Sequence, residues 1–199
     1  ENVDERVGVI ASLPTAGESA SPTVAKNAHT RINQLCGLAE KGKIAPLIMV
    51  DNEKIKKLYP KLTVKKFWTT INNTVAGLFH VFNVLANKDS EYTTFDATDY
   101  DSIMKQPGCM IMGVTSVKNL ENQTAVSSAL KKNLEKTLLA EGFDLTTATG
   151  AACIVVGSEE IFEETVGLMD NIEFGFDTLA ALTGGAMVHR GIYEDQNKD

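Results

Sequence analysis

The sequence predicts an α/β protein in which two α/β parts are joined by one long helix. Short apolar, β-rich runs alternate with longer segments whose apolar residues recur at helical spacing. One such segment, 63–87, keeps this spacing for about seven turns. No internal repeat or low-complexity stretch interrupts the alternation. We therefore expect a βαβ unit in the first part and the order β-α-β-α-β in the second.

The βαβ unit is predicted from the first 51 residues. The run "RVGVIASLP" (6–14) predicts a strand that ends at Pro14, and "TAGESASPT" (15–23) has the composition of a loop. Helical spacing then continues to Gly42. The continuous apolar run "IAPLIMVD" (44–51) is typical of a parallel strand covered on both faces. A right-handed crossover is expected between the two strands.

A lysine-rich segment follows the second strand. It could form a basic patch for an acidic partner, but a solvated helix and a turn around Pro60 explain it more simply. We adopt the simpler interpretation. The lysines are Lys54, Lys56, Lys57, Lys61, Lys65 and Lys66.

The long helix predicted over 63–87 starts at Thr63, a suitable N-cap residue. Its apolar residues form a continuous stripe, and additional aromatic residues widen this stripe, so we expect a helix buried on most sides. His80 is then expected to be a core residue. Such a helix usually joins two bodies of a protein.

The second part is predicted to contain three strands, at 108–117, 150–158 and 186–195. A helix ending at Gly142 separates the first two strands. One or two helices, with Ser158 as the N-cap, separate the last two.

Composition excludes several classes of protein. A net charge of −7 argues against general nucleic-acid binding, because phosphates require a basic face. No apolar run reaches the roughly 18 residues of a membrane span, and no signal sequence is recognisable. Three scattered cysteines are expected to be buried thiols of a reducing cytoplasm rather than disulfides or zinc ligands. They are Cys36, Cys109 and Cys153.

Known phosphate-binding loops, metal-binding patterns and nucleophile elbows are not found in the sequence. Two pairs of residues remain as candidates. Trp68 and Asn72 lie four apart on the long helix, where a ring could stack on a purine and an amide could bond a base edge. A core tryptophan and a surface asparagine would explain the same spacing. Asp96 and Asp99 lie where a loop meets a helix; Asp96 could cap that helix, or both could perform chemistry.

The order of these elements resembles the tubulin/FtsZ superfamily of polymerising GTPases. "RVGVIASLP" resembles the family's V-G-V-V-T-x-P-F strand, and "APLIMVDNEKI" resembles L-I-V-I-P-N-D-x-L. The segment 94–99, "TFDATD", is similar to the acidic motif N-x-D-x-x-D. The following "YDSIMKQPGCMIMGVTS" is similar to V-x-T-V-M-x-x-x-G-x-A-M-M-G-I-G. The resemblance covers nearly the whole chain.

The resemblance implies a domain layout. Residues 1–62 would be the end of a Rossmann-like GTP-binding domain, 63–87 the central helix, and 88–199 the C-terminal domain. The Gly-rich phosphate loop would lie before residue 1. The chain alone would therefore lack a complete active site.

The resemblance also implies a mechanism. The parent protein would bind GTP and Mg²⁺ and assemble head to tail into a filament with itself, in the cytoplasm. Neither direct nucleic-acid binding nor membrane insertion is expected. Asp96 and Asp99 would position the attacking water at the GTP of the next subunit. No metal ligand is assigned to this chain.

The same resemblance assigns Trp68 and Asn72 to the guanine, with Phe67 as an alternative ring and Asn73 less well placed, and Glu18 to the ribose. Two departures weaken it: Thr94 replaces the family's asparagine, and Pro22 replaces an arginine. The alternative function is a non-enzymatic module that binds or caps a related filament.

Overall fold

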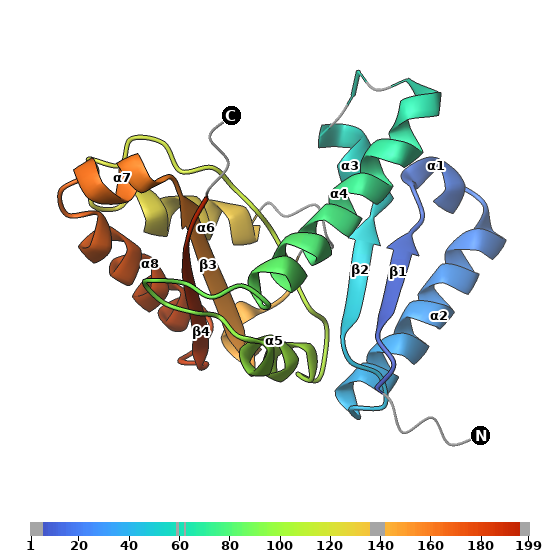
Figure 1. Ribbon diagram of the computed structural model, residues 1–199. Helices are drawn as coiled ribbons and strands as arrows, with labels where there is room; N and C mark the ends of the chain where they lie inside the picture. Colours follow the sequence, from blue (N-terminus) through green and yellow to red (C-terminus); the bar gives the residue numbers. More distant parts are fainter. Residues whose placement is uncertain (1–5, 59, 62, 136–141, 196–199) are drawn as a thin grey trace. The chain divides into compact units, whose positions relative to one another are not determined.

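The computed structural model describes residues 6–58, 60–61, 63–135 and 142–195, and these form two compact units (Figure 1). The first unit holds the described residues up to Leu78 together with Met104–Gly113. The second holds the described residues of 79–103, 114–135 and 142–195. Short parallel sheets combined with helices confirm the α/β class.

The first unit is built on two parallel strands, β1 (Val9–Leu13) and β2 (Leu47–Asp51), paired from Val9↔Leu47 to Leu13↔Asp51. They are joined through α2 (Pro22–Glu40), which confirms the predicted βαβ unit. Four consecutive residues of β2, Leu47–Val50, are buried, as expected for a parallel strand covered on both faces. Ala39 of α2 packs with Ile44 and Leu47 to form this unit's core.

Three further helices lie in this part of the sequence. α1 (Ala16–Ser19) occupies part of the segment predicted as loop, because Thr15 and Glu18 form a capping box that stabilises one short turn. α3 (Asn52–Leu58) follows β2 directly. α4 (Val64–Leu85) confirms the long helix and runs on into the second unit.

Two predictions about α4 are wrong. Trp68, Val81 and Val84 are each about half exposed, so the helix is not buried on most sides within this chain. His80 is exposed as well, and is therefore not a core residue. Periodicity identified the face that bears Leu78 and Leu85, both buried, but it overestimated how wide that face is. Not one helix among the described residues is both long enough and apolar enough to cross a membrane.

The second unit is built on the parallel strands β3 (Ala151–Gly157) and β4 (Val188–Glu194). α6 (Ala125–Glu135) and α8 (Leu168–Leu182) contribute to one core cluster, which receives Ile192. The end of α4 and Phe95 contribute to a second cluster, which receives Tyr193. Because neighbouring residues of a strand point to opposite faces, β4 supplies both cores.

The loops and caps of this unit fix the packing of its helices. Ser158 caps α7 (Glu159–Glu164) as predicted, its hydroxyl accepting from the amide of Ile161. Buried Asn171 of α8 accepts from the amide of Val126 at 3.2 Å, which ties the start of α6 to α8. α5 (Ala97–Met104) and a short 3₁₀ turn, Leu145–Thr147, complete the elements of the described chain.

The predicted strand at 108–117 is wrong. Only Cys109 forms a bridge there, parallel to Leu47 of the first unit, and the amide of Met110 donates to the carbonyl of Leu47 at 2.8 Å. The apolar run contributes one pairing residue and then continues as irregular chain. The three cysteines, which were expected to be buried, are free and partly buried: Cys36, Cys109 and Cys153.

Candidate functional site

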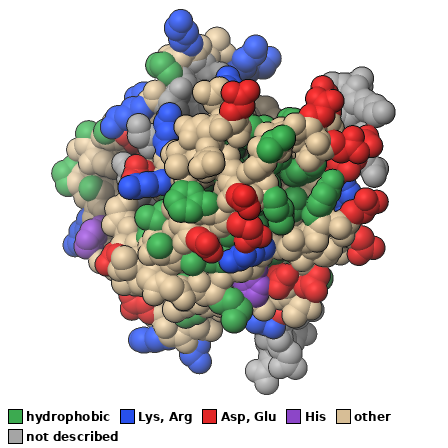
Figure 2. All heavy atoms as spheres, turned by 90° about the vertical axis from the view of Figure 1, so that its left-hand side faces the viewer, with side chains coloured by type: hydrophobic (Ala, Val, Ile, Leu, Met, Phe, Trp, Pro, Cys, Tyr) green, Lys and Arg blue, Asp and Glu red, His purple; other side chains and the backbone are tan. Residues whose placement is uncertain are grey.

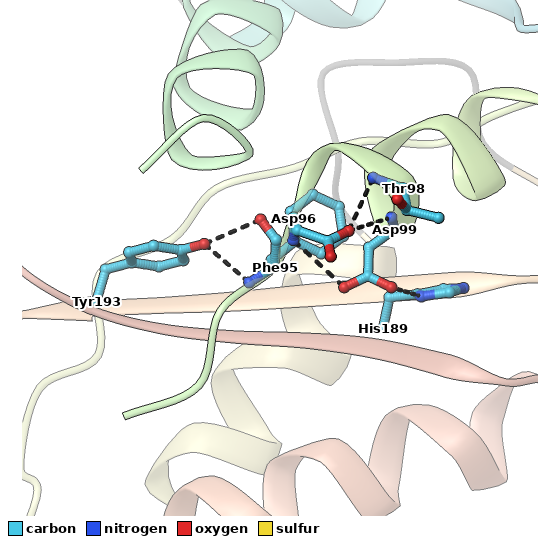
Figure 3. A network of polar contacts seen from close by, with 6 residues as sticks. All are labelled: Phe95, Asp96, Thr98, Asp99, His189 and Tyr193. Carbon is cyan, nitrogen blue, oxygen red and sulfur yellow. Dashed lines mark hydrogen bonds and ion pairs between the residues drawn. The ribbon is translucent and has the colours of Figure 1, made fainter. Parts of the chain in front are cut away.

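The candidate site is the acidic loop, residues 88–99, which leads into α5. Asp96 is the N-cap of that helix: its Oδ1 accepts from the amides of Thr98 at 2.8 Å and Asp99 at 2.9 Å (Figure 3). The predicted capping role is therefore confirmed. Asp96 is exposed, and its second oxygen, Oδ2, forms no hydrogen bond to any described residue. That oxygen can accept a hydrogen bond from outside the chain.

Asp99 closes the capping box from the other side. Its Oδ2 accepts from the amide of Asp96 at 3.3 Å, and its Oδ1 lies 2.6 Å from Nδ1 of His189 (Figure 3). Nδ1 must carry the proton of this bond, since an ionised carboxylate can only accept. The side chains of Asp99 and His189 are 31% and 15% exposed. Both oxygens of Asp99 are therefore engaged within the unit, in contrast to those of Asp96.

His189 is the residue that sequence reasoning missed. It lies 90 residues from Asp99 in the chain. β4 brings it to the start of α5. No local pattern could have identified this pair, because it depends on tertiary packing.

Strand β4 also holds the backbone just before the two carboxylates. The hydroxyl of Tyr193 accepts from the amide of Phe95 at 2.8 Å and donates to the carbonyl of Phe95 at 3.0 Å (Figure 3). Thr93 pairs antiparallel with Ile192, and Ser90 donates to the carbonyl of Ile192. The acidic loop is thus attached to the sheet along most of its length.

Burial raises the pKa of the Tyr193 hydroxyl above its ordinary value of 10.0. The negative charges of Asp96, Asp99 and Asp89 raise it further, whereas the hydrogen bond to Phe95 lowers it. The hydroxyl therefore stays protonated over the whole neutral range and keeps both of its bonds to Phe95.

Thr94 stands where the resemblance predicted asparagine. Its hydroxyl accepts from the amide of Ser90 at 3.2 Å, which closes a tight turn within the acidic loop. The substituted residue therefore has a structural role of its own here. The side chain itself is exposed.

Trp68 and Asn72 lie four residues apart on α4, and both are exposed, Trp68 by 50%. An indole ring can stack on a purine and an amide offers both a donor and an acceptor, which is the reason this pair is predicted to bind a base. Asn73 is exposed too, while the side chain of Phe67 lies outside the described ones. The assignment of Trp68 and Asn72 to a nucleotide stays a prediction.

Glu18 is the third predicted nucleotide contact. Its carboxylate accepts from the amide of Thr15 at 2.8 Å and from the Thr15 hydroxyl at 3.0 Å, and these bonds lower its pKa. It is exposed and ionised at neutral pH. Glu53 of α3 accepts from the amide of Ala16 at 3.0 Å, so two acidic side chains hold the first turn of α1.

The described side chains contain no preformed cluster of metal ligands. Within the described ranges, no group of three or more His, Cys, Asp or Glu side chains is arranged to hold a metal ion. Mg²⁺ usually keeps several waters and binds through one or two carboxylates and substrate phosphates, so this finding concerns only a site built from this chain's side chains alone.

The parallel sheets, the long α4 and the anchored acidic loop define a tubulin/FtsZ-like protein. Residues 93–197 match the family described as the C-terminal domain of the tubulin-like protein TubZ, which is more than half of the chain. The chain belongs to this family, and covers the C-terminal portion of such a protein. No match to a curated protein is found.

Solved structures show the same fold. TubZ of Bacillus thuringiensis serovar israelensis, in GDP-form protofilaments, has a TM-score of 0.75 and 17% identity over 96% of this chain and 50% of its own. A type III plasmid segregation TubZ has a TM-score of 0.74 and 16% identity, and the match covers 96% of this chain and 53% of that protein. The FtsZ dimer of M. jannaschii, described as empty, has a TM-score of 0.69 and 19% identity, and the match covers 98% of this chain and 52% of that protein. The chain spans about half the length of these proteins.

Proposed function

We propose that this chain is part of a filament-forming GTPase in which the acidic loop completes the GTP site of the next subunit. The observation that carries the proposal is the exposed carboxylate of Asp96, on a loop fixed to β4, with one oxygen that bonds to none of the described residues. Relatives of this fold were solved as protofilaments in GDP and GTPγS forms, which supports assembly with guanine nucleotide.

The carboxylates would act on water. Asp96 would accept a hydrogen bond from the water that attacks the γ-phosphorus, and the bond from that phosphorus to the β–γ bridging oxygen would break, giving GDP and phosphate. Catalysis of this transfer depends mostly on positioning and charge, so a fixed carboxylate is a suitable contributor. Asp99, held by His189, would keep the loop and its negative charge in place.

The same protein would hold the guanine base on Trp68 and Asn72 and the ribose near Glu18. All three residues precede the acidic loop in the sequence. Each filament contact would then join the nucleotide of one subunit to the acidic loop of the next. Such heterologous contacts build open filaments.

The test is isosteric removal of the two charges in the full-length protein. Asp96→Asn keeps the helix cap, because asparagine caps as well as aspartate. We expect the double variant, Asp96→Asn with Asp99→Asn, to sediment with GTP like wild type. Its rate of GTP hydrolysis should fall by a factor of about a hundred or more. Hydrolysis at the wild-type rate in normal filaments would refute the catalytic role and favour a docking surface instead.

A further inference from the structure

The apolar side chains exposed on this chain need no specific explanation. On the side of the molecule that bears α7 and α8, hydrophobic side chains are interspersed with acidic ones (Figure 2). Exposed apolar side chains scattered in this way are normal on folded proteins. Two partly buried thiols in the first unit, Cys36 and Cys109, are different, because a free thiol is chemically reactive as well as apolar.

These two cysteines lie far apart in the sequence but on the same core cluster. Cys36 belongs to α2, one turn before Ala39, and Cys109 belongs to the segment Met104–Gly113, which follows α5. Both side chains pack against the buried cluster that contains Ala39 and Leu47. Neither thiol is fully buried, so a small oxidant can reach them.

Backbone contacts hold the two cysteines beside each other. The amide of Gly108 donates to the carbonyl of Ala39 at 3.2 Å, and Cys109 forms a parallel bridge with Leu47. Gly108 has a φ of +88°, in the left-handed region that glycine adopts readily, and this conformation allows the turn just before Cys109. Residues three apart lie on the same face of a helix. The side chain of Cys36 is therefore on the face of α2 that the backbone at Gly108 contacts.

The surroundings of Cys109 assign different roles to the two sulfurs. The pKa of the Cys109 thiol is raised to about 11, chiefly by burial; the charge of Cys36, a hydrogen bond to the Cys36 side chain and the charge of Glu40 act in the same direction. A thiolate, rather than a thiol, attacks an oxidant. Cys109 keeps its proton at neutral pH, so Cys36 is the sulfur expected to be oxidised first and Cys109 the resolving thiol.

We propose that Cys36 and Cys109 are a redox-sensitive pair, which a peroxide joins in a reversible disulfide that locks the segment Met104–Gly113 to α2. In the first step a peroxide oxygen bonds to the sulfur of Cys36, the O–O bond breaks, and the remaining hydroxide leaves as water with the thiol proton. In the second step the sulfur of Cys109 attacks that of Cys36, the S–O bond breaks, and a second water leaves with the proton of Cys109. Two thiols and one peroxide thus give one disulfide and two waters.

The disulfide would act on the segment that follows α5. In the reduced protein, hydrogen bonds of Gly108 and Met110 and the bridge at Cys109 attach this segment to the first unit. A covalent bond between distant positions closes a long loop and restricts its opening. Disulfides that form in a reducing compartment are usually transient and sense oxidants. This inference does not depend on the proposed GTP chemistry.

The test is treatment of the reduced full-length protein with hydrogen peroxide, followed by alkylation of the remaining thiols, digestion and mass spectrometry. We expect one peptide pair joined through Cys36 and Cys109, which dithiothreitol separates. Cys153, in β3 of the second unit, is the internal reference and should remain an alkylated thiol. In the oxidised protein, amide hydrogen exchange in Met104–Gly113 should slow by about tenfold or more, because the cross-link restricts local opening.

The variants are conservative serine replacements. Cys36→Ser and Cys109→Ser should each lose the joined peptides and the slowed exchange, whereas the matched control Cys153→Ser should keep both. The mapping of wild-type protein decides the matter even where a serine variant does not fold. The inference is overturned if peroxide converts the two thiols to sulfinic acids without joining them, or joins cysteines of different molecules. A disulfide at these positions that leaves the exchange of the segment unchanged would overturn the lock.

Discussion

Asp96 and Asp99 are three residues apart, yet their carboxylates have different surroundings because one lies at the N-cap and the other in the first turn of α5. Among the described residues, Asp96 accepts only from backbone amides and through one oxygen, which leaves the other oxygen without a partner in this part of the chain. Asp99 uses both oxygens, one toward Asp96 and one toward His189. We infer that His189 positions Asp99, and through the capping box also restricts the movement of Asp96.

Replacing His189 therefore tests positioning separately from chemistry. In the full-length protein, we expect His189→Ala to lower kcat for GTP hydrolysis about ten- to hundredfold, because a carboxylate displaced by about 1 Å loses that much rate. KM for GTP should stay unchanged, since the base and ribose contacts are on other residues. Steady-state kinetics of assembled protein measure both constants.

The control for this substitution is His80→Ala, which removes an exposed imidazole from α4. It should retain wild-type kcat. A rise in KM together with a fall in kcat for His189→Ala, or a wild-type kcat, would contradict the positioning role of the Asp99–His189 pair.

The residue scale also shows what sequence could predict. The cap at Asp96 and the cap at Ser158 were predictable because capping involves residues within one helical turn. The Asp99–His189 and Tyr193–Phe95 contacts were not, because they join residues 90 or more positions apart. The long-range anchoring of the candidate site is therefore invisible in a single sequence.

At the scale of elements, β4 is the strand that fixes the acidic loop. Its Ile192 and Tyr193 face opposite core clusters and pair with Thr93 and Phe95. Strand existence and parallel pairing followed from apolar runs at βαβ spacing. The apolar run at 108–117 gave the wrong answer because apolar composition alone does not provide a partner strand. Only Cys109 forms a bridge there, only Met112 is buried, and Val114 is 73% exposed.

Tyr193→Phe tests the link between β4 and the loop. The change leaves the amide and carbonyl of Phe95 without their buried partner, so we expect a loss of about 1–3 kcal/mol in the free energy of unfolding near neutral pH. Urea denaturation measures this loss. Tyr92→Phe, at a half-exposed tyrosine, is the control and should change it by less than about 0.5 kcal/mol.

The stability difference between wild type and Tyr193→Phe should also depend on pH. Burial raises the pKa of folded Tyr193 above the value of 10.0 expected for the unfolded chain. Its contribution to stability is then complete below pH 10.0 and is lost as the pH rises through the folded pKa. The difference between wild type and Tyr193→Phe should therefore shrink above pH 10.0. A difference that grows with pH would contradict the burial of this hydroxyl.

At the scale of the whole molecule, the proposed site is divided between copies. Trp68 and Asn72 belong to the first unit and the acidic loop belongs to the second. In the proposed function, a single chain would bind the base with one unit and would offer its carboxylates to a neighbour with the other. The division predicts that two different defects can compensate for each other within one filament.

Mixing variants tests this directly. Trp68→Ala removes the stacking surface for the base, which is worth about 1–3 kcal/mol in other base-binding sites. Asp96→Asn with Asp99→Asn keeps the base contacts and removes the acidic charges. In random mixed filaments, about a quarter of the contacts join an intact base site to an intact acidic loop, because heterologous contacts combine one surface from each copy.

We therefore expect an equal mixture of the two full-length variants to recover about a quarter of the wild-type GTP hydrolysis rate, while each variant alone stays near background. Phosphate release during sedimentation-competent assembly is the measurement. Trp68→Phe retains an aromatic ring and serves as the control, hydrolysing GTP on its own. A mixture no more active than the average of its components would mean that each acidic loop serves its own subunit, and the division of the site between neighbours would be wrong.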